Sequence, residues 1–182
     1  MVTTFALALE LVLGVEGGLV NHPFDHGGET KYGISARAHP GVDIATLTAD
    51  QARTIYWEQY AQPIQFDALA SISEAVALAT FDAAVHHGPA QAIRFLQRSA
   101  GLEKGGVDGV VGPRTIRAVA EWVVLDQDEL LGRFYTYRLM HFQNIVTQDP
   151  SQHVFLKGWI KRVVGLIQIT HTSENIGVVG NG

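Results

Sequence analysis

The sequence contains no cysteine, which excludes disulfide bonds and thiolate metal sites. It also lacks any basic cluster: its 13 lysines and arginines are scattered, and 18 acidic residues give a formal net charge of -5. A protein that binds nucleic acid through the phosphates needs a basic patch. We therefore expect neither DNA nor RNA as a partner.

No apolar run reaches the ~20 residues that a membrane-spanning helix needs. The most apolar stretch, residues 2–15, is interrupted by Glu10. A secretory signal peptide begins with a basic segment, whereas the first lysine or arginine in this sequence is Lys31. The sequence thus predicts a protein made in the cytoplasm without a recognisable signal peptide.

Helix signals dominate the chain, of which 47% is hydrophobic and 17% charged. Caps, apolar periodicity, prolines and glycines predict helices over residues 3–15, 48–62, 72–86, 89–100, 113–124, 128–146 and 154–169. Residues 17–33 instead hold five glycines and favour turns or a short hairpin. The expected fold is mainly α, a lysozyme-like α+β helical bundle with a small irregular or β-hairpin segment around residues 17–34.

Two carboxylates in contrasting surroundings lie close together in the sequence. Glu16 ends an apolar helical stripe, where partial desolvation would raise its pKa and suit it to act as a general acid. Asp25 lies in a polar turn that contains Gly28, where it would stay ionised and activate a water molecule, with the Thr30 hydroxyl beside it. Such a pair of carboxyl groups predicts glycoside hydrolysis.

The residues alone leave two matters open. A glutamate near a helix end and an aspartate in a turn are also common as solvated caps. If Glu16 and Asp25 are catalytic, a carboxyl separation of ~6.5–9.5 Å would give inversion and one of ~5 Å would give retention of the anomeric configuration. The sequence does not give this separation, so inversion and retention are both compatible with it.

The run VEGGLVNHPFDHGGETKYGI at residues 15–34 resembles the signature of the glycoside hydrolase family 108 lysozymes. That signature is Glu-Gly-Gly followed by Asp-x-Gly-Gly-x-Thr-x-x-Gly-Ile. It is matched by Glu16, Gly17, Gly18, Asp25, Gly27, Gly28, Thr30, Gly33 and Ile34. The resemblance implies that Glu16 is the catalytic acid; a similar order of Glu, Asp and Thr in phage-type lysozymes suggests catalytic roles for Asp25 and Thr30.

The resemblance continues along the chain. FDAAVHHG at residues 81–88 is similar to the family's Asp-x-x-Val-Asn-x-Gly element beside the cleft, which implies that Asp82 and His86 contact substrate. His86 replaces the family's usual Asn, so the contacts there would differ. Residues 89–172 resemble a helical peptidoglycan-binding-type region. The expected organisation is a catalytic region at 1–88, this region packed on it, and a flexible tail at 173–182.

Aromatic residues and histidines are further candidates for binding groups. Tyr32 and Tyr56 are candidates to contact sugar rings, with Gly28 allowing close approach, although each tyrosine also suits a core position. His22 and His26 flank a proline in a turn, and adjacent histidines on a helix point apart. We therefore expect no metal and no cofactor.

The predicted activity is that of a lysozyme or endolysin, which hydrolyses the β-1,4 bond between N-acetylmuramic acid and N-acetylglucosamine. Expected partners are peptidoglycan glycan strands and a holin-type membrane protein that lets the enzyme reach the periplasmic wall, with the protein itself a monomer. A non-catalytic cell-wall-binding or secretion-assisting protein on the same fold is the alternative. Release of reducing sugar ends would separate the two.

Overall fold

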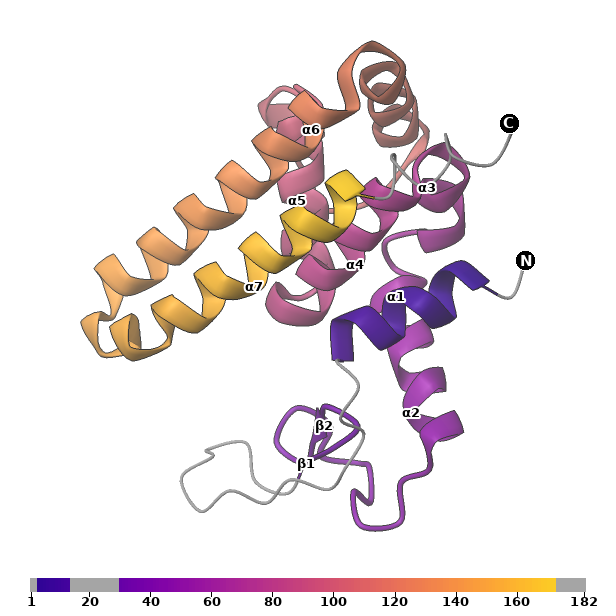
Figure 1. Ribbon diagram of the computed structural model, residues 1–182, viewed down its shortest axis with the longest axis vertical. Coiled ribbons are helices and arrows are strands. Elements are labelled where there is room, and N and C mark those ends of the chain that lie inside the picture. Colours follow the sequence, from indigo (N-terminus) through magenta and orange to yellow (C-terminus); the bar gives the residue numbers. More distant parts are fainter. Residues whose placement is uncertain (1–2, 14–29, 173–182) are drawn as a thin grey trace. The chain divides into compact units, whose positions relative to one another are not determined.

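The computed structural model describes residues 3–13 and 30–172 (Figure 1). The chain forms two compact units, residues 1–62 and 63–182, and each is described by itself. Within the described residues the structure holds seven α-helices and one small antiparallel hairpin. The predicted fold class, mainly α with a minor β-hairpin, is confirmed.

The first unit contains helices α1 (Thr3–Leu13) and α2 (Ala49–Tyr56), and α2 continues into a π-helical turn, Trp57–Ala61. The predicted capping box at the start of α2 is present. The Gln51 backbone N–H donates to the Thr48 hydroxyl at 3.2 Å, and the Thr48 N–H donates to the Gln51 side chain at 2.8 Å. These two bonds satisfy donors that a helix start otherwise leaves free.

The hairpin pairs β1 (Thr30–Lys31) with β2 (Ile34–Ser35) in antiparallel register. Its two turn residues, Tyr32 and Gly33, have φ values of 51° and 73°. Left-handed backbone at both central positions is the type I′ geometry, which matches the natural twist of paired strands. The hairpin predicted around residues 17–34 is therefore found at the end of that segment.

All the regular secondary structure of residues 63–172, the described part of the second unit, is helical. Its main helices are α3 (Phe66–Ile72), α4 (Glu74–His87), α5 (Pro89–Ser99), α6 (Pro113–Gln148) and α7 (His153–Thr172), with 3-10 turns at Lys104–Gly106 and Pro150–Gln152. Helix α4 is buried at every position from 76 to 84, and it contacts α3, α5, α6 and α7. A helix that is buried on all sides needs such a surrounding layer.

Helix α6 is broken at Asp126, whose φ of -165° is not helical. The Asp126 carboxylate accepts a bond of 2.9 Å from the Glu129 N–H and so caps the second half. This break corresponds to the gap between the two helices predicted at 113–124 and 128–146. Helix α3 was not predicted; it is short and starts after Gln65, which has a φ of 51°.

A polar network fixes the glycine-rich loop between α5 and α6. The fully buried Gln97 donates to the Asp108 carboxylate at 2.7 Å and to the Val110 carbonyl at 3.0 Å, and it accepts from the Gly109 N–H at 2.9 Å. The loop thus obtains from the Gln97 side chain hydrogen bonds that its own backbone does not supply.

No helix among the described residues is long and apolar enough to cross a membrane.

Candidate functional site

Three of the predicted site residues, Glu16, Asp25 and Gly28, lie outside the described residues. The described residues on either side of that segment are Leu13, which ends α1, and Thr30, which begins β1. Helix α1 buries Leu9 and Val12 of its predicted apolar stripe, and it also buries Ala8.

Gly33 is the point where α1, α2 and the hairpin meet. A Cβ atom added to Gly33 would lie 2.6 Å from the Tyr56 hydroxyl oxygen and 3.0 Å from Leu13 Cδ2. Only glycine tolerates both this contact and the positive φ. The glycine of the Thr-x-x-Gly-Ile motif is thus needed for close packing, and Leu13 is held directly beside the turn that follows Thr30.

Tyr56 and Tyr32 are brought together by a hydrogen bond. The buried Tyr56 hydroxyl donates to the backbone carbonyl of Tyr32 at 3.2 Å, while the Tyr32 side chain is half-buried. The Tyr56 hydroxyl is therefore committed to holding the hairpin turn. The Tyr32 ring, over which the Lys31 ammonium lies 5.7 Å from the centroid, retains accessible surface.

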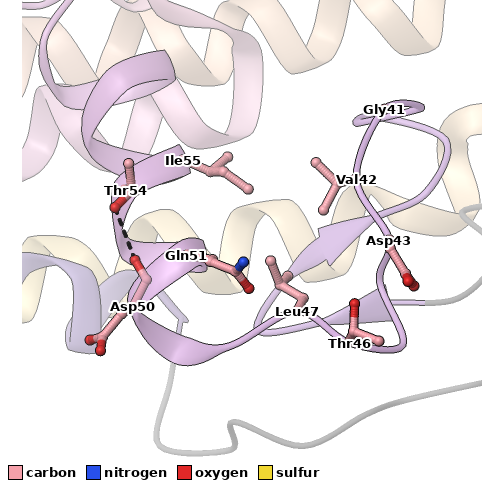
Figure 2. Close-up of a pocket in the computed structure, with 9 residues that line it drawn as sticks. All are labelled: Gly41, Val42, Asp43, Thr46, Leu47, Asp50, Gln51, Thr54 and Ile55. Atoms are coloured by element: carbon pink, nitrogen blue, oxygen red, sulfur yellow. Dashed lines mark hydrogen bonds between the residues drawn. The ribbon is translucent and has the colours of Figure 1, made fainter.

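A pocket of about 510 Å³ opens between the loop that follows the hairpin and the first turns of α2 (Figure 2). Its lining residues are Gly41, Val42, Asp43, Thr46, Leu47, Asp50, Gln51, Thr54 and Ile55. Val42 and Ile55 face each other across it. Lys31 ties the hairpin to this loop by donating to the Ala45 carbonyl at 3.1 Å. Apolar walls with oxygen-bearing side chains at the edge suit a sugar, which has apolar faces and hydroxyl rims.

In the second unit, Asp82 lies in a buried cluster of charged residues. Its side chain on α4 forms ion pairs with Arg138 of α6 at 2.6 Å and with Arg162 of α7 at 2.7 Å. The Asp82 residue is 3% exposed and Arg138 is 0% exposed. The aspartate predicted to contact substrate therefore connects three helices, and both of its oxygens already face arginines.

His86 and His87 complete this cluster as hydrogen-bond acceptors. Arg138 Nε donates to His87 Nε2 at 3.1 Å, and Arg138 Nη2 lies 3.3 Å from His86 Nδ1. Burial, and then the charge of Arg138, lower the pKa of His86 to about 4 and that of His87 to about 2. Since a guanidinium only donates, both rings accept, which leaves the His86 proton on Nε2. The imidazole at the family's Asn position thus acts as an acceptor for Arg138.

The predicted residues form two groups, one in each unit. Tyr32, Tyr56 and Thr30 belong to the hairpin group, and Asp82 and His86 belong to the Arg138 group. Their roles as substrate contacts stay predictions. Sequence reasoning missed Arg138, Arg162 and the pocket beside α2. The only local signal was the spacing of Asp82 and His86, which places them on one face of a helix.

The residues that the structure describes are mainly helical with one short hairpin, whose turn contains the glycine of the Thr-x-x-Gly-Ile motif. This is the architecture expected of a lysozyme-like glycosidase. The chain belongs to the glycosyl hydrolase 108 family, whose model matches residues 9–88. A second model, described as a "Predicted Peptidoglycan domain", matches residues 91–164. Family membership implies a glycosidase, and the second match supports peptidoglycan as its ligand.

A solved structure is similar to this chain over nearly its whole length. The structure of Brucella abortus SagA is 30% identical in sequence and superposes with a TM-score of 0.76, covering 94% of this chain and 96% of that chain. No curated protein matches the sequence.

The first family match ends at residue 88 and the second begins at residue 91, whereas the structure divides into its two compact units between residues 62 and 63. The predicted division at 88 stays a prediction.

Proposed function

We propose that the protein is an N-acetylmuramidase that hydrolyses the β-1,4 bond between N-acetylmuramic acid and N-acetylglucosamine, with Glu16 as the general acid. The observation that carries this proposal is the complete motif at residues 15–34 inside the matched glycosyl hydrolase region, in a chain that also matches a peptidoglycan domain. A general acid must protonate the leaving glycosidic oxygen, and a carboxyl group is the usual donor.

The packing of the first unit supports this assignment. Helix α1 enters the apolar core through Leu9 and Val12 and reaches the hairpin turn at Leu13, three residues before Glu16 in the sequence. If the Glu16 carboxyl lies against this apolar core, it would lose hydration, which favours its protonated form. Asp25 would activate the attacking water and Thr30 would help to orient it.

Tyr32 and Tyr56 take different parts in this proposal. The half-buried Tyr32 ring would stack on a sugar ring, while Tyr56 would act as a positioning residue, because its hydroxyl holds the Tyr32 carbonyl at 3.2 Å. The pocket beside α2 would receive a further part of the glycan strand, with Asp43 and Asp50 as acceptors for sugar hydroxyls.

Product analysis tests the proposal. Purified peptidoglycan is digested with the protein, the new reducing ends are converted to alditols with borohydride, and the fragments are identified by mass spectrometry. A muramidase leaves N-acetylmuramitol at the new ends. Fragments that end in N-acetylglucosaminitol, or no new ends at all, would contradict the proposal, and the second result would favour a wall-binding protein without catalysis.

The substrate also suggests where the protein acts. We propose that it is made in the cytoplasm and acts on the periplasmic face of the wall, with release assisted by a membrane-permeabilising partner of the holin type. Fractionation of cells that express the full chain, with and without such a partner, tests this. Wall lysis that does not depend on a membrane-permeabilising partner would contradict it.

A further inference from the structure

Helix α7 and the second half of α6 lie side by side as an antiparallel pair (Figure 1). Two contacts set their pairing: Phe142 stacks on Trp159 with 5.1 Å between ring centroids, and the Tyr135 hydroxyl lies 2.9 Å from that of Thr170. On each helix a row of exposed residues, three and four positions apart, follows the side away from the buried core. We call these two rows the outer face. It consists of Asp128, Glu129, Gly132, Thr136, Leu139, Met140 and Gln143 of α6 and Lys157, Ile160, Lys161 and Val164 of α7.

The middle of the outer face is apolar. Its four large apolar side chains are each 38–52% exposed, and they are Leu139, Met140, Ile160 and Val164. A pocket of about 390 Å³ is lined by Leu139 and Gln143 on α6 and by Ile160 on α7, which places the two rows on the same side of the helix pair. A cluster of exposed large apolar side chains is typical of an interaction surface.

The two ends of the outer face carry charges of opposite sign. Asp128 and Glu129 lie where the second half of α6 begins, whereas Lys157 and Lys161 lie near the start of α7. Because the helices are antiparallel, the lysines are beside the C-terminal end of α6, and Lys157 is roughly 20 Å from Glu129 along the pair at ~1.5 Å per residue. Asp149, the carboxylate nearest to the lysines in the sequence, is bonded within the turn before α7. One end of the face is therefore acidic and the other basic.

Two further cationic groups lie near the acidic end. The Arg133 guanidinium lies over the Trp122 ring, 4.9 Å from its centroid, and so contacts the first half of α6. His171 Nε2 lies 3.6 Å from the Asp128 carboxylate. A single imidazole supplies at most one positive charge against two carboxylates, so this end keeps its negative sign.

We propose that the outer face binds a second copy of this chain, with a two-fold axis across the middle of the face. The two α6–α7 pairs then run antiparallel to each other, and the acidic end of each copy meets the basic end of the other. The apolar side chains of both copies meet at the axis and lose their contact with water. A dimer differs from the monomer expected from the sequence, because only the structure shows that these groups share one face.

The size of the outer face fits a modest affinity. Two helices about 10 Å wide, side by side over ~20 residues, present roughly 600 Å². Counted on both copies, this reaches the ~1,200 Å² at which specific interfaces begin. The predicted dissociation constant is therefore micromolar rather than nanomolar.

An anionic membrane surface is the main competing partner, because lysines beside exposed apolar side chains also favour lipid. The acidic end of the outer face argues against a membrane, since anionic headgroups would repel Asp128 and Glu129 on the same face. A second copy satisfies the charges of both ends at once. Binding to lipid is an outcome of the test.

The test is sedimentation equilibrium of the full chain at low salt, from about 1 to 200 µM, which brackets a micromolar dissociation constant. Val164→Glu places a carboxylate in the apolar middle of the face and is expected to weaken self-association about tenfold or more. Val110→Glu, at a valine that is 64% exposed in the loop before α6, is the matched control and should associate as the parent does.

Charge reversal tests the antiparallel arrangement. Lys157→Glu with Lys161→Glu, and separately Asp128→Lys with Glu129→Lys, should each weaken self-association about tenfold at low salt, because like charges then meet at both contacts. An equal mixture of the two reversed proteins should form heterodimers about as tightly as the parent dimerises. In a parallel arrangement like ends would already face each other, so reversing one end would leave the repulsion unchanged.

Three results would overturn the proposal. One is a parent protein that stays monomeric at the highest concentration, and another is Val164→Glu that associates within about twofold of the parent. The third is a mixture of the reversed proteins that associates no more tightly than either alone. Binding of a monomeric parent to phosphatidylglycerol vesicles that is lost in Val164→Glu would assign the outer face to a membrane instead.

The dimer does not rest on the proposed function. If self-association behaves as expected while product analysis finds no muramidase cleavage, the dimer stands and the catalytic proposal fails. If muramidase cleavage is found and the parent stays monomeric, the catalytic proposal stands and the dimer fails. Thermal unfolding of each variant, at a concentration where the parent is monomeric, confirms that the fold is retained.

Discussion

Asp82 on α4 and Arg138 on α6 form an ion pair, with 2.6 Å between Oδ2 and Nη1, that is almost wholly removed from water. Two charges buried in this way are stable only when each has its partner. Arg162 of α7 adds a second cation to the same carboxylate, and its side chain is 34% exposed. One aspartate thus holds together three helices of the second unit.

We predict that Asp82→Asn lowers the free energy of unfolding by about 3 kcal/mol, because it leaves the buried Arg138 without its counter-charge. Urea denaturation measures this. Glu121→Gln, which removes an exposed carboxylate from α6, is the control and should change stability by less than ~0.5 kcal/mol. If Asp82 served only as a substrate contact, Asp82→Asn would raise KM and leave the denaturation midpoint unchanged.

The histidines beside Arg138 predict acid sensitivity. Burial lowers the pKa of His86 from 6.5 to about 4 and that of His87 from 6.5 to about 2 in the folded protein. Between these folded values and 6.5 the unfolded chain therefore binds more protons. The neutral histidines therefore contribute their full share to the free energy of unfolding above pH 6.5, and this contribution decreases as the pH falls toward 4.

This pH effect is measured by urea denaturation between pH 7.5 and pH 4.5. Each of the two histidines contributes at most about 1.4 kcal/mol of lost stability per pH unit. His87→Gln should flatten the profile, whereas the same substitution at the exposed His153 should leave its slope unchanged. A profile for the parent protein that does not change between these pH values would show that the imidazoles are not buried as described.

The packing at Gly33 predicts a specific rescue. Gly33→Ala should destabilise the protein by about 1–3 kcal/mol, because it combines a positive φ with a Cβ that would lie 2.6 Å from the Tyr56 hydroxyl. Tyr56→Phe removes that oxygen, so the double variant should be more stable than the sum of the two single effects predicts. A Cβ at Gly41 would meet nothing within 4 Å, which makes Gly41→Ala the control. Additive effects in this double-mutant cycle would contradict the close contact.

Gln97 is predicted to be essential for the loop between α5 and α6. Gln97→Leu keeps the size of the buried side chain but leaves the Gly109 N–H and the Asp108 carboxylate without this partner. The expected loss is about 1–3 kcal/mol in the free energy of unfolding. Hydrogen exchange should show faster exchange at Gly109 in particular. The control is Gln148→Leu, because Gln148 is an exposed glutamine at the end of α6.

Local signals in the sequence were sufficient for much of the fold. The capping pair Thr48 and Gln51 marked the start of α2, Gly88 and Pro89 separated α4 from α5, and the glycine-rich segment ended in the hairpin. Each of these features depends on residues a few positions apart. Helix α3 was missed because seven residues give too little periodicity, and its left-handed start at Gln65 lacks the expected glycine.

The candidate site was less accessible to sequence reasoning. The Asp82 to Arg162 contact joins residues 80 positions apart, and no periodicity in either helix indicates it. Arginine is rarely buried, so nothing local suggested that Arg138 would be shielded from water. The motif residues were recognised through resemblance to a family. The spacing alone was also compatible with ordinary solvated caps.

The central claim is that the Glu16 carboxyl protonates the leaving sugar oxygen, and lysis of purified peptidoglycan by the full-length Glu16→Gln variant tests it most directly. Glu10→Gln is the matched control, because Glu10 is an exposed carboxylate on α1 only six positions earlier. We expect Glu16→Gln to lower the rate of reducing-end release by about 10²-fold or more and Glu10→Gln to leave it unchanged. A Glu16→Gln rate near that of the parent protein would contradict the account.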